Sequence, residues 1–331
     1  MRIPPIIVRF CLFVLGLIVV LLFLNWFVTF GAKHSSKNWT GKINSVFGHA
    51  IDPEFILFGS SVADVGFDAP LFQELTQMSA FNAAIDGTAL RQNQALIHEF
   101  IGYSEDCEYL AIGISFFSFT NSKGPLTQPT RWYAQIGNEN IDTMFRQNVP
   151  DLYWKVRWLP GYAFTQYSAT FYKDSAYGWL NYLKGQRYTS ATLGSMLQDR
   201  PYDEAEAISP SQFDTKLIQI DSAFVSQVEQ LLQEIRAKGI RVILIRFPMY
   251  IDGQRTFKNY SEVSDVIRQE LIQPGDIFID FSDHPLCNDK TYFYNNGHVN
   301  RDGAQKVTEE IAKQVQLLSD TSQQRAGANQ Q

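Results

Sequence analysis

The strongest constraint on the fold is an alternation of short apolar runs with segments of helical periodicity. The apolar runs are "FILFG" from residue 55, "AFNAAI" from 80, "YLAIGISFF" at 109–117, "IRVILIRFP" from 240 and "DIFIDFS" at 276–282. Between them, apolar residues recur every three or four positions, as in "AFVSQVEQLLQEIRAKG" at 223–239. Strands that alternate with helices predict a doubly wound parallel sheet with helices on both faces. We therefore expect a three-layer α/β fold with a five-stranded parallel sheet.

The helices expected around these strands set the limits of the domain. They span residues 69–78, 89–103, 223–239 and 261–272, and a closing helix covers 300–318. We therefore place the α/β domain at 54–318. The polar segment 33–53 is predicted to be a linker, and the polar segment 319–331 a disordered tail.

A stretch without charged residues near the N-terminus, 10–32, predicts a membrane anchor behind a short tail, 1–9. A helix of this length, at about 1.5 Å per residue, spans a hydrocarbon core of roughly 30 Å. A cleaved signal peptide is the alternative, but its apolar region would run only about 7–15 residues. Trp26 and Phe27 stand where interfacial aromatic residues are found, which favours an anchor. Basic residues flank both ends of the stretch, so the charge pattern does not fix its orientation.

Residues 118–215 interrupt the alternation and are rich in Trp, Tyr and Phe. We predict a mostly helical insertion. One interpretation is that the aromatic residues fill a small second core. The other is that they form a cap over the active site, with exposed rings that touch sugar or lipid.

Charge and cysteine content exclude several classes of function. The net charge is −6 and no cluster of Lys and Arg is present, which argues against a nucleic-acid partner. No Cys and His residues have zinc-site spacing, so we expect no metal and no other cofactor. Cys107 and Cys287 are expected at opposite ends of the sheet as unpaired thiols, with a disulfide as the alternative if the domain is exported.

Polar residues and glycines directly follow the predicted strands. Ligands of a doubly wound sheet bind beyond the carboxyl ends of its strands. These positions hold Ser60, Ser61, Asp86, Gly87, Gly113, Ser115 and Arg246. Arg246 could bind an anionic headgroup or form a plain ion pair. Asp64 and Asp68 are expected to be helix-start or turn residues.

A serine at such a turn needs a base to become a nucleophile. His298, just before the closing helix, is the histidine in a suitable place. His34 and His49 fall in the predicted linker, His98 in a helix and His284 in a loop. The backbone N–H groups of Ser61 and Gly87 could stabilise an oxyanion. The sequence therefore predicts a Ser–His site for acyl chemistry.

These residues resemble the SGNH/GDSL hydrolase superfamily over about 54–117 and 240–315. "FGSSV" is similar to the first block of the family, which implies that Ser61 rather than Ser60 is the nucleophile. "NAAIDG" is similar to the second block and implies Gly87 as an oxyanion donor. "IGIS" places Ser115 where the family has an oxyanion asparagine. "NNGH" implies His298 as the base, with Asn295 in the place of the expected aspartate.

Asn295 is the departure that bears most on catalysis. In serine proteases, changing the equivalent Asp to Asn lowers kcat about 10⁴-fold. Asn295 could still orient His298 through its side-chain oxygen, or a backbone carbonyl could. Asp283, Asp289 or Asp302 could also reach the imidazole. The alternative to catalysis is a fold that carries an inactive site.

The anchored branch of this superfamily resembles proteins of D-alanyl-lipoteichoic acid biosynthesis and accessory proteins of alginate O-acetylation. The resemblance implies a single-pass membrane protein whose main domain is extracytoplasmic, beside a membrane-bound O-acyltransferase. It also implies an acyltransferase that acts on acyl groups of cell-envelope polysaccharides. An anchored esterase and a non-catalytic scaffold subunit are the alternatives.

Overall fold

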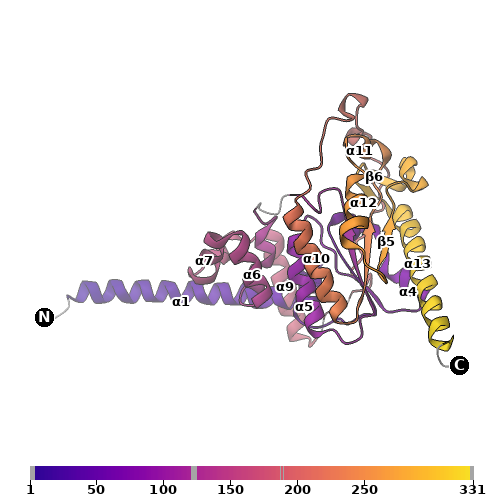
Figure 1. Ribbon diagram of the computed structural model, residues 1–331. Helices are drawn as coiled ribbons and strands as arrows, with labels where there is room; N and C mark the ends of the chain where they lie inside the picture. Colours follow the sequence, from indigo (N-terminus) through magenta and orange to yellow (C-terminus); the bar gives the residue numbers. More distant parts are fainter. Residues whose placement is uncertain (1–3, 121–124, 187, 189, 329–331) are drawn as a thin grey trace. The chain divides into compact units, whose positions relative to one another are not determined.

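The computed structural model describes residues 4–120, 125–186, 188 and 190–328, and side chains as far as residue 318. The chain forms two compact units. The helical unit comprises Met1–Ala50 and Pro125–Thr189. The α/β unit comprises Ile51–Gly124 and Ser190–Gln331. Figure 1 labels the elements of both units.

The α/β unit contains the predicted five-stranded parallel sheet. Its strands are β1 (Phe55–Phe58), β2 (Ala80–Asn82), β3 (Tyr109–Ile114), β4 (Arg241–Arg246) and β5 (Ile277–Asp280). They lie in the order β2-β1-β3-β4-β5, and every pairing is parallel. This order reverses between β1 and β3, which creates the crevice where doubly wound sheets bind ligands.

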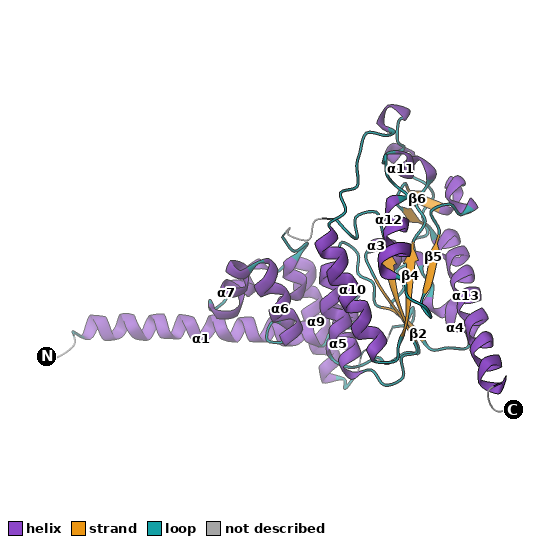
Figure 2. Ribbon diagram, in the orientation of Figure 1, coloured by secondary structure: helices purple, strands orange, loops and turns teal. Residues whose placement is uncertain are grey.

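Helices cover both faces of this sheet (Figure 2). One face carries α3 (Ser61–Gly66), α4 (Ala69–Thr76) and α13 (Arg301–Ala328), and the other carries α5 (Leu90–Tyr103) and α10 (Ser222–Ala237). Side chains of β1 alternate between the two layers: the Phe55 ring lies 4.2 Å from Phe72 of α4, and the Phe58 ring 5.8 Å from Phe100 of α5. Because both faces are covered, the strand reads as a continuous apolar run.

Shorter elements complete the unit. They are the 3₁₀ turns η2 (Glu204–Glu206), η3 (Pro210–Gln212), η5 (Pro285–Asn288) and η6 (Lys290–Tyr292), the helices α11 (Ile251–Arg255) and α12 (Glu262–Val266), and the strands β6 (Phe293–Asn295) and β7 (His298–Val299). α12 continues into a π-helical turn, η4 (Ile267–Leu271), where the sequence predicted one regular helix over 261–272. β6 and β7 pair as a small antiparallel hairpin directly before α13.

The helical unit combines the N-terminal helices with most of the predicted insertion. Its elements are α1 (Pro5–Lys33), α2 (Asn38–Phe47), η1 (Pro129–Gln135), α6 (Glu139–Asn148), α7 (Pro150–Trp158), α8 (Tyr162–Gln166) and α9 (Ala169–Leu183). α1 packs closely on α9, where a Cβ on Gly31 would meet the Ser175 backbone and Trp179. The Trp179 indole stacks on Phe27 at 4.8 Å and donates a hydrogen bond to the Phe27 carbonyl.

Several boundaries differ from the sequence predictions. Residues 33–53 are not a simple linker, because α2 forms there and buries Ile43 and Val46. Residues 190–215 belong to the α/β unit rather than to the insertion. α1 begins at Pro5, inside the predicted tail. α13 continues to Ala328, so the predicted disordered tail is helical as far as that residue, and residues 329–331 lie outside the described chain.

The polar composition of 33–53 misled the prediction because its polar groups are bonded within the fold. The Asn44 amide donates to the carbonyls of Ala32 and Ser35 at 2.7 and 2.8 Å. The Thr40 hydroxyl donates to Asp174 at 2.8 Å. Polar side chains with such partners are compatible with burial.

Candidate active site

Ser61 is the first residue of α3, at the turn that follows β1. Small residues let this helix start close to the sheet. A Cβ on Gly59 would lie 2.8 Å from the Ala63 methyl and 3.3 Å from the Gly113 backbone. A larger residue at 59 would therefore push α3 away from β3. The Gly-Ser-Ser sequence thus places the Ser61 hydroxyl, on a half-buried residue, at the carboxyl edge of the sheet.

A chain of hydrogen bonds connects Ser61 to His298 and Asn295. The Ser61 Oγ lies 2.8 Å from His298 Nε2, and His298 Nδ1 lies 2.9 Å from Asn295 Oδ1. The Gly297 N–H donates to the same Oδ1 at 3.0 Å, which identifies this atom as the oxygen. Nδ1 must then carry the ring proton and donate it to Asn295, so Nε2 is free to accept the Ser61 O–H.

The β6–β7 hairpin holds both partners of this serine. Asn295 and His298 are opposite each other in its register. Asn300 ties the hairpin to the closing helix, because its amide donates to the Thr291 carbonyl and its Oδ1 accepts from the Gly303 N–H. A Cβ on Gly303 would collide with the Tyr292 carbonyl. Asn300 and Gly303 of the "GHVNRDGA" segment thus hold the His298 imidazole in a fixed position relative to α13.

Burial of the imidazole sets its electrostatics. Desolvation lowers the pKa of His298 below its usual 6.5. The Asp86 carboxylate acts in the opposite direction and raises this pKa, while the Arg200 guanidinium lowers it further. The Tyr294 ring stacks on His298 at 5.4 Å, and Arg200 lies 4.5 Å from the Tyr294 ring centre. The site therefore favours a neutral imidazole near pH 7.

The loop after β2 lies beside the serine turn. The Gly59 carbonyl accepts from the Ile85 N–H at 3.0 Å and from the Thr88 hydroxyl at 3.4 Å. Gly87, between them, has φ of 68°, a conformation that favours glycine. These bonds hold the loop at the same edge of the sheet as the serine turn, where the Asp86 carboxylate raises the pKa of His298. Its suggested role as an oxyanion donor remains a prediction.

Ser115 directly follows β3, on the other side of the crevice from β2. The residue is 6% exposed, and its N–H donates to the Ser118 hydroxyl at 2.9 Å. The two hydroxyl oxygens lie 3.2 Å apart. Ser118 thus orients Ser115, and the Ser115 contribution to an oxyanion site also remains a prediction.

The position behind His298 Nδ1 belongs to Asn295 rather than to one of the suggested aspartates. Asp289 accepts hydrogen bonds from the Thr291 N–H and hydroxyl, which lower the pKa of its carboxyl. Ser60, the other serine of the turn, has a buried hydroxyl with no hydrogen-bond partner among the described residues. The structure therefore brings Ser61, and not Ser60, to His298.

Other residues singled out in the sequence have structural surroundings. Arg246 is 1% exposed, donates to Ser264 and to the Tyr260 carbonyl, and lies 4.1 Å from the Tyr260 ring centre, so its guanidinium is not available to a headgroup.

His98 pairs with Glu234 at 3.2 Å on the surface. Asp68 caps α4 by accepting from the Leu71 N–H. His284 accepts from the Leu286 N–H, and Cys107 and Cys287 are free thiols.

Two residues beside the imidazole were missed from the sequence. Tyr294 directly precedes Asn295 in the "YFYNNGH" segment. An aromatic residue at this position did not indicate by itself that its ring would stack on the imidazole. Arg200 lies far from His298 in the sequence and reaches Tyr294 only in the folded unit. Only the three-dimensional arrangement shows that they influence the base.

No protein-family model matches the chain, and no curated protein matches it. Within the described residues, no group of three or more His, Cys, Asp and Glu side chains could hold a metal ion. Pro5–Lys33 is the one helix, among those described, that is long and apolar enough to cross a membrane.

Proposed function

We propose that this protein is a membrane-anchored serine acyltransferase that acts on acyl groups of cell-envelope polysaccharides. The observation that carries the proposal is the hydrogen-bond chain from Ser61 through His298 to Asn295. The resemblance of the surrounding segments to the SGNH/GDSL superfamily supports the same assignment.

In the proposed reaction, the Ser61 Oγ attacks the carbonyl carbon of an acyl donor while His298 Nε2 takes the hydroxyl proton. The N–H groups of Ser61 and Gly87 and the Ser115 hydroxyl stabilise the negative oxygen of the tetrahedral intermediate. The bond to the donor's leaving group then breaks, and His298 returns the proton to that group. A polysaccharide hydroxyl next attacks the Ser61 ester, with His298 again as base, and Ser61 is regenerated.

Asn295 supplies one of the two usual contributions of a triad aspartate. Its oxygen selects the productive tautomer of His298, as the Gly297 hydrogen bond requires. A neutral amide does not offset the charge of the imidazolium that forms during the reaction. The nearby carboxylate of Asp86 supplies part of that stabilisation, since it favours the protonated ring.

The anchor and the partners belong to the same proposal. α1 holds the protein at the membrane, with the α/β unit outside the cytoplasm. A membrane-bound O-acyltransferase supplies the acyl group, and tethering raises the effective concentration of that donor at Ser61. The chemistry needs no cofactor. An esterase would use the same residues and differ only in taking water as the acceptor.

Labelling with a fluorophosphonate probe tests the nucleophile. The full-length protein in detergent should be labelled, and Ser61→Ala should abolish the labelling while thermal unfolding changes little. Ser60→Ala is the matched control, because Ser60 is adjacent and its hydroxyl does not reach the imidazole. Labelling that survives Ser61→Ala, or that disappears only in Ser60→Ala, contradicts the assignment. A protein that never reacts would favour the scaffold function.

A further inference from the structure

The helix α7 presents an apolar surface that no other part of the helical unit covers. Trp154, Trp158 and Leu159 are 56%, 63% and 40% exposed, and α7 has no buried residue. Two basic residues, Lys155 and Arg157, lie on the same helix. Large aromatic residues beside Lys and Arg are typical of helices that lie in a membrane interface.

The loop after α7 fixes its position along α1. Gly161 is buried, and a Cβ on it would lie 3.0 to 3.4 Å from the side chain of Leu21. Leu21 is within the apolar part of α1, five residues before Trp26. At about 1.5 Å per residue, the loop therefore lies roughly 7 Å beyond Trp26 toward the N-terminus of α1. Figure 1 shows α7 at the level of the C-terminal half of α1.

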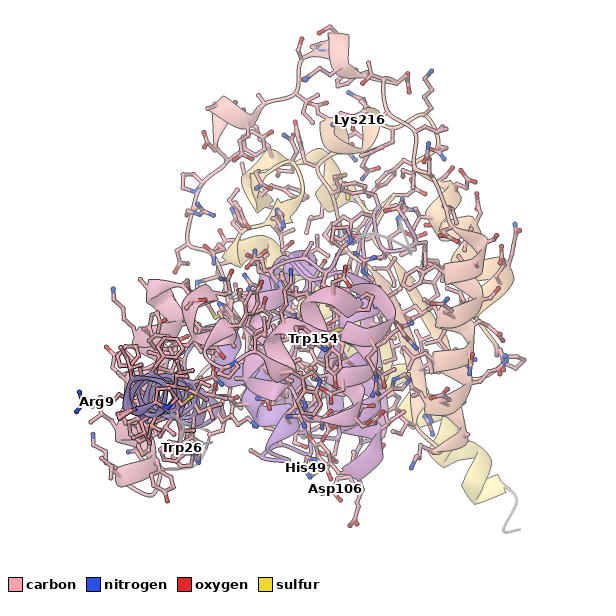
Figure 3. The ribbon with its side chains drawn as sticks, turned by 90° about the vertical axis from the view of Figure 1, so that its left-hand side faces the viewer. Arg9, Trp26, His49, Asp106, Trp154 and Lys216 are labelled. Atoms are coloured by element: carbon pink, nitrogen blue, oxygen red, sulfur yellow. The ribbon has the colours of Figure 1, made fainter. Side chains whose placement is uncertain are left out.

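This position places the α7 surface at the level of the apolar surface of α1. On α1, Leu22, Phe23 and Trp26 are 52%, 56% and 52% exposed, and the most apolar window of the helix is not buried within the protein. Figure 3 views the helical unit from the N-terminal side of α1, and the helix that carries Trp154 lies at the front. If α1 crosses a bilayer, α7 lies at a level where it meets the same bilayer.

We propose that α7 is an interfacial membrane helix, with Trp154, Trp158 and Leu159 inserted into the bilayer beside α1. The inferred depth, roughly 7 Å inside the level of Trp26, agrees with the about 5–10 Å at which amphipathic helices bury their apolar faces. Lys155 and Arg157 extend toward lipid phosphates. The helical unit is thus a second membrane attachment that restricts the tilt and rotation of the anchor. This inference rests on the membrane location of α1 and is independent of the acyl chemistry.

Spin labels on the full-length protein test this depth. The protein is reconstituted in vesicles of phosphatidylcholine and phosphatidylglycerol, and Cys11→Ala removes the exposed native thiol. Burial raises the pKa of Cys107 to about 12 and that of Cys287 to about 11, so neither forms much reactive thiolate at pH 7. A label at Trp154→Cys should collide several-fold more with oxygen, which concentrates in lipid, than with a water-soluble nickel complex.

Two further sites make the outcome decisive. Leu183→Cys is the matched control, because Leu183 is 74% exposed and its neighbour Tyr182 contacts the ring of His34, beyond the end of α1. Its label should favour the nickel complex. Val19→Cys reports the anchor itself. A nickel-accessible label at residue 154 beside a lipid-exposed label at residue 19 overturns the proposal and leaves the α7 surface for a protein partner. Water exposure at residue 19 would instead overturn the anchor, and fluorophosphonate labelling of Ser61 on the same samples reports the chemistry separately.

Discussion

Buried or half-buried polar side chains form groups of hydrogen bonds in both units, but the bonds end differently in the two units. In the helical unit, Asn44 donates to two backbone carbonyls and accepts from the Gln135 amide at 2.9 Å, and Thr40 donates to Asp174. In the α/β unit, the chain from Asn295 through His298 ends on the hydroxyl of the half-buried Ser61. The first group is closed by the protein itself, whereas the second ends on a group that a ligand can reach. Polar burial therefore indicates a site only when the chain of bonds stays open at one end.

The largest effect that distinguishes the two groups is expected from His298→Ala. Without the base, Ser61 remains protonated, and the rate of fluorophosphonate labelling should fall about 10³-fold or more. Added imidazole should restore part of the rate by occupying the vacated space. His98→Ala is the matched control, because it removes a surface histidine that contacts Glu234 rather than Ser61. A rate that is equal in both variants would remove His298 from the proposed mechanism.

Asn295 gives the next effect, and two substitutions separate its two functions. Asn295→Leu removes the acceptor that selects the tautomer of His298, so the labelling rate should fall by about 10² to 10⁴. Asn295→Asp keeps the hydrogen bonds and adds a charge that stabilises the imidazolium, so the rate should rise. A rate that falls in Asn295→Asp would show that the neutral amide is suited to its function, and equal rates in all three proteins would contradict any orienting contribution.

Asp174→Ala perturbs the closed group instead. This carboxylate is 2% exposed and accepts from Thr40 and Asn38, which would lose their partner. The helical unit should lose about 1–3 kcal/mol of stability, and proteolysis of its helices should show the change. Labelling of Ser61 should stay at the level of the unaltered protein. If labelling were lost while resistance to protease stayed unchanged, Asp174 would affect the Ser61 site rather than the stability of the helical unit, which contradicts the distinction between the two groups.

The sheet was predictable from the sequence because each strand is buried on both faces and therefore reads as an apolar run. β1, for example, alternates its phenylalanines between two helical layers without any polar interruption. α2 was missed for the converse reason, since its polar residues satisfy backbone and side-chain groups inside the helical unit. Composition reports how polar a segment is, and not whether its polar groups find partners within the fold.

The candidate site was predictable only in part. A serine after the first strand and a histidine before the last helix follow from the rule that places ligands at the carboxyl edge of a sheet. The hydrogen-bond partner of His298 Nδ1 could not be predicted in this way, because Asn295 and three aspartates all lie close enough to His298 in the sequence. The β6–β7 hairpin decides among them by setting Asn295 opposite His298. Arg200 left no sequence signal, since its effect depends on stacking against Tyr294.

The smallest effect concerns the pH dependence of the open group. Labelling needs neutral His298, and burial lowers the pKa of this imidazole below 6.5. The rate should therefore be constant near pH 7 and fall only as the pH drops below about 6.5. We call this fall in rate at low pH the acidic limb of the pH–rate profile. Changes to two surface charges should move the limb in opposite directions, in each case by less than about one pH unit.

Arg200→Gln removes a cation that disfavours the imidazolium, so the pKa of His298 rises and the limb moves to higher pH. Asp86→Asn removes an anion that favours the imidazolium, so the pKa falls and the limb moves to lower pH. At pH 8 the resting ring is neutral in every variant, so Arg200→Gln should not lower the rate, whereas Asp86→Asn should lower it modestly because the imidazolium that forms during the reaction loses a favourable charge. Rates measured between pH 5 and 8 on the three proteins check this assignment. Limbs that coincide would mean that the group titrating in the profile is not His298, whereas a loss at pH 8 in Arg200→Gln would show that the guanidinium contacts the substrate directly.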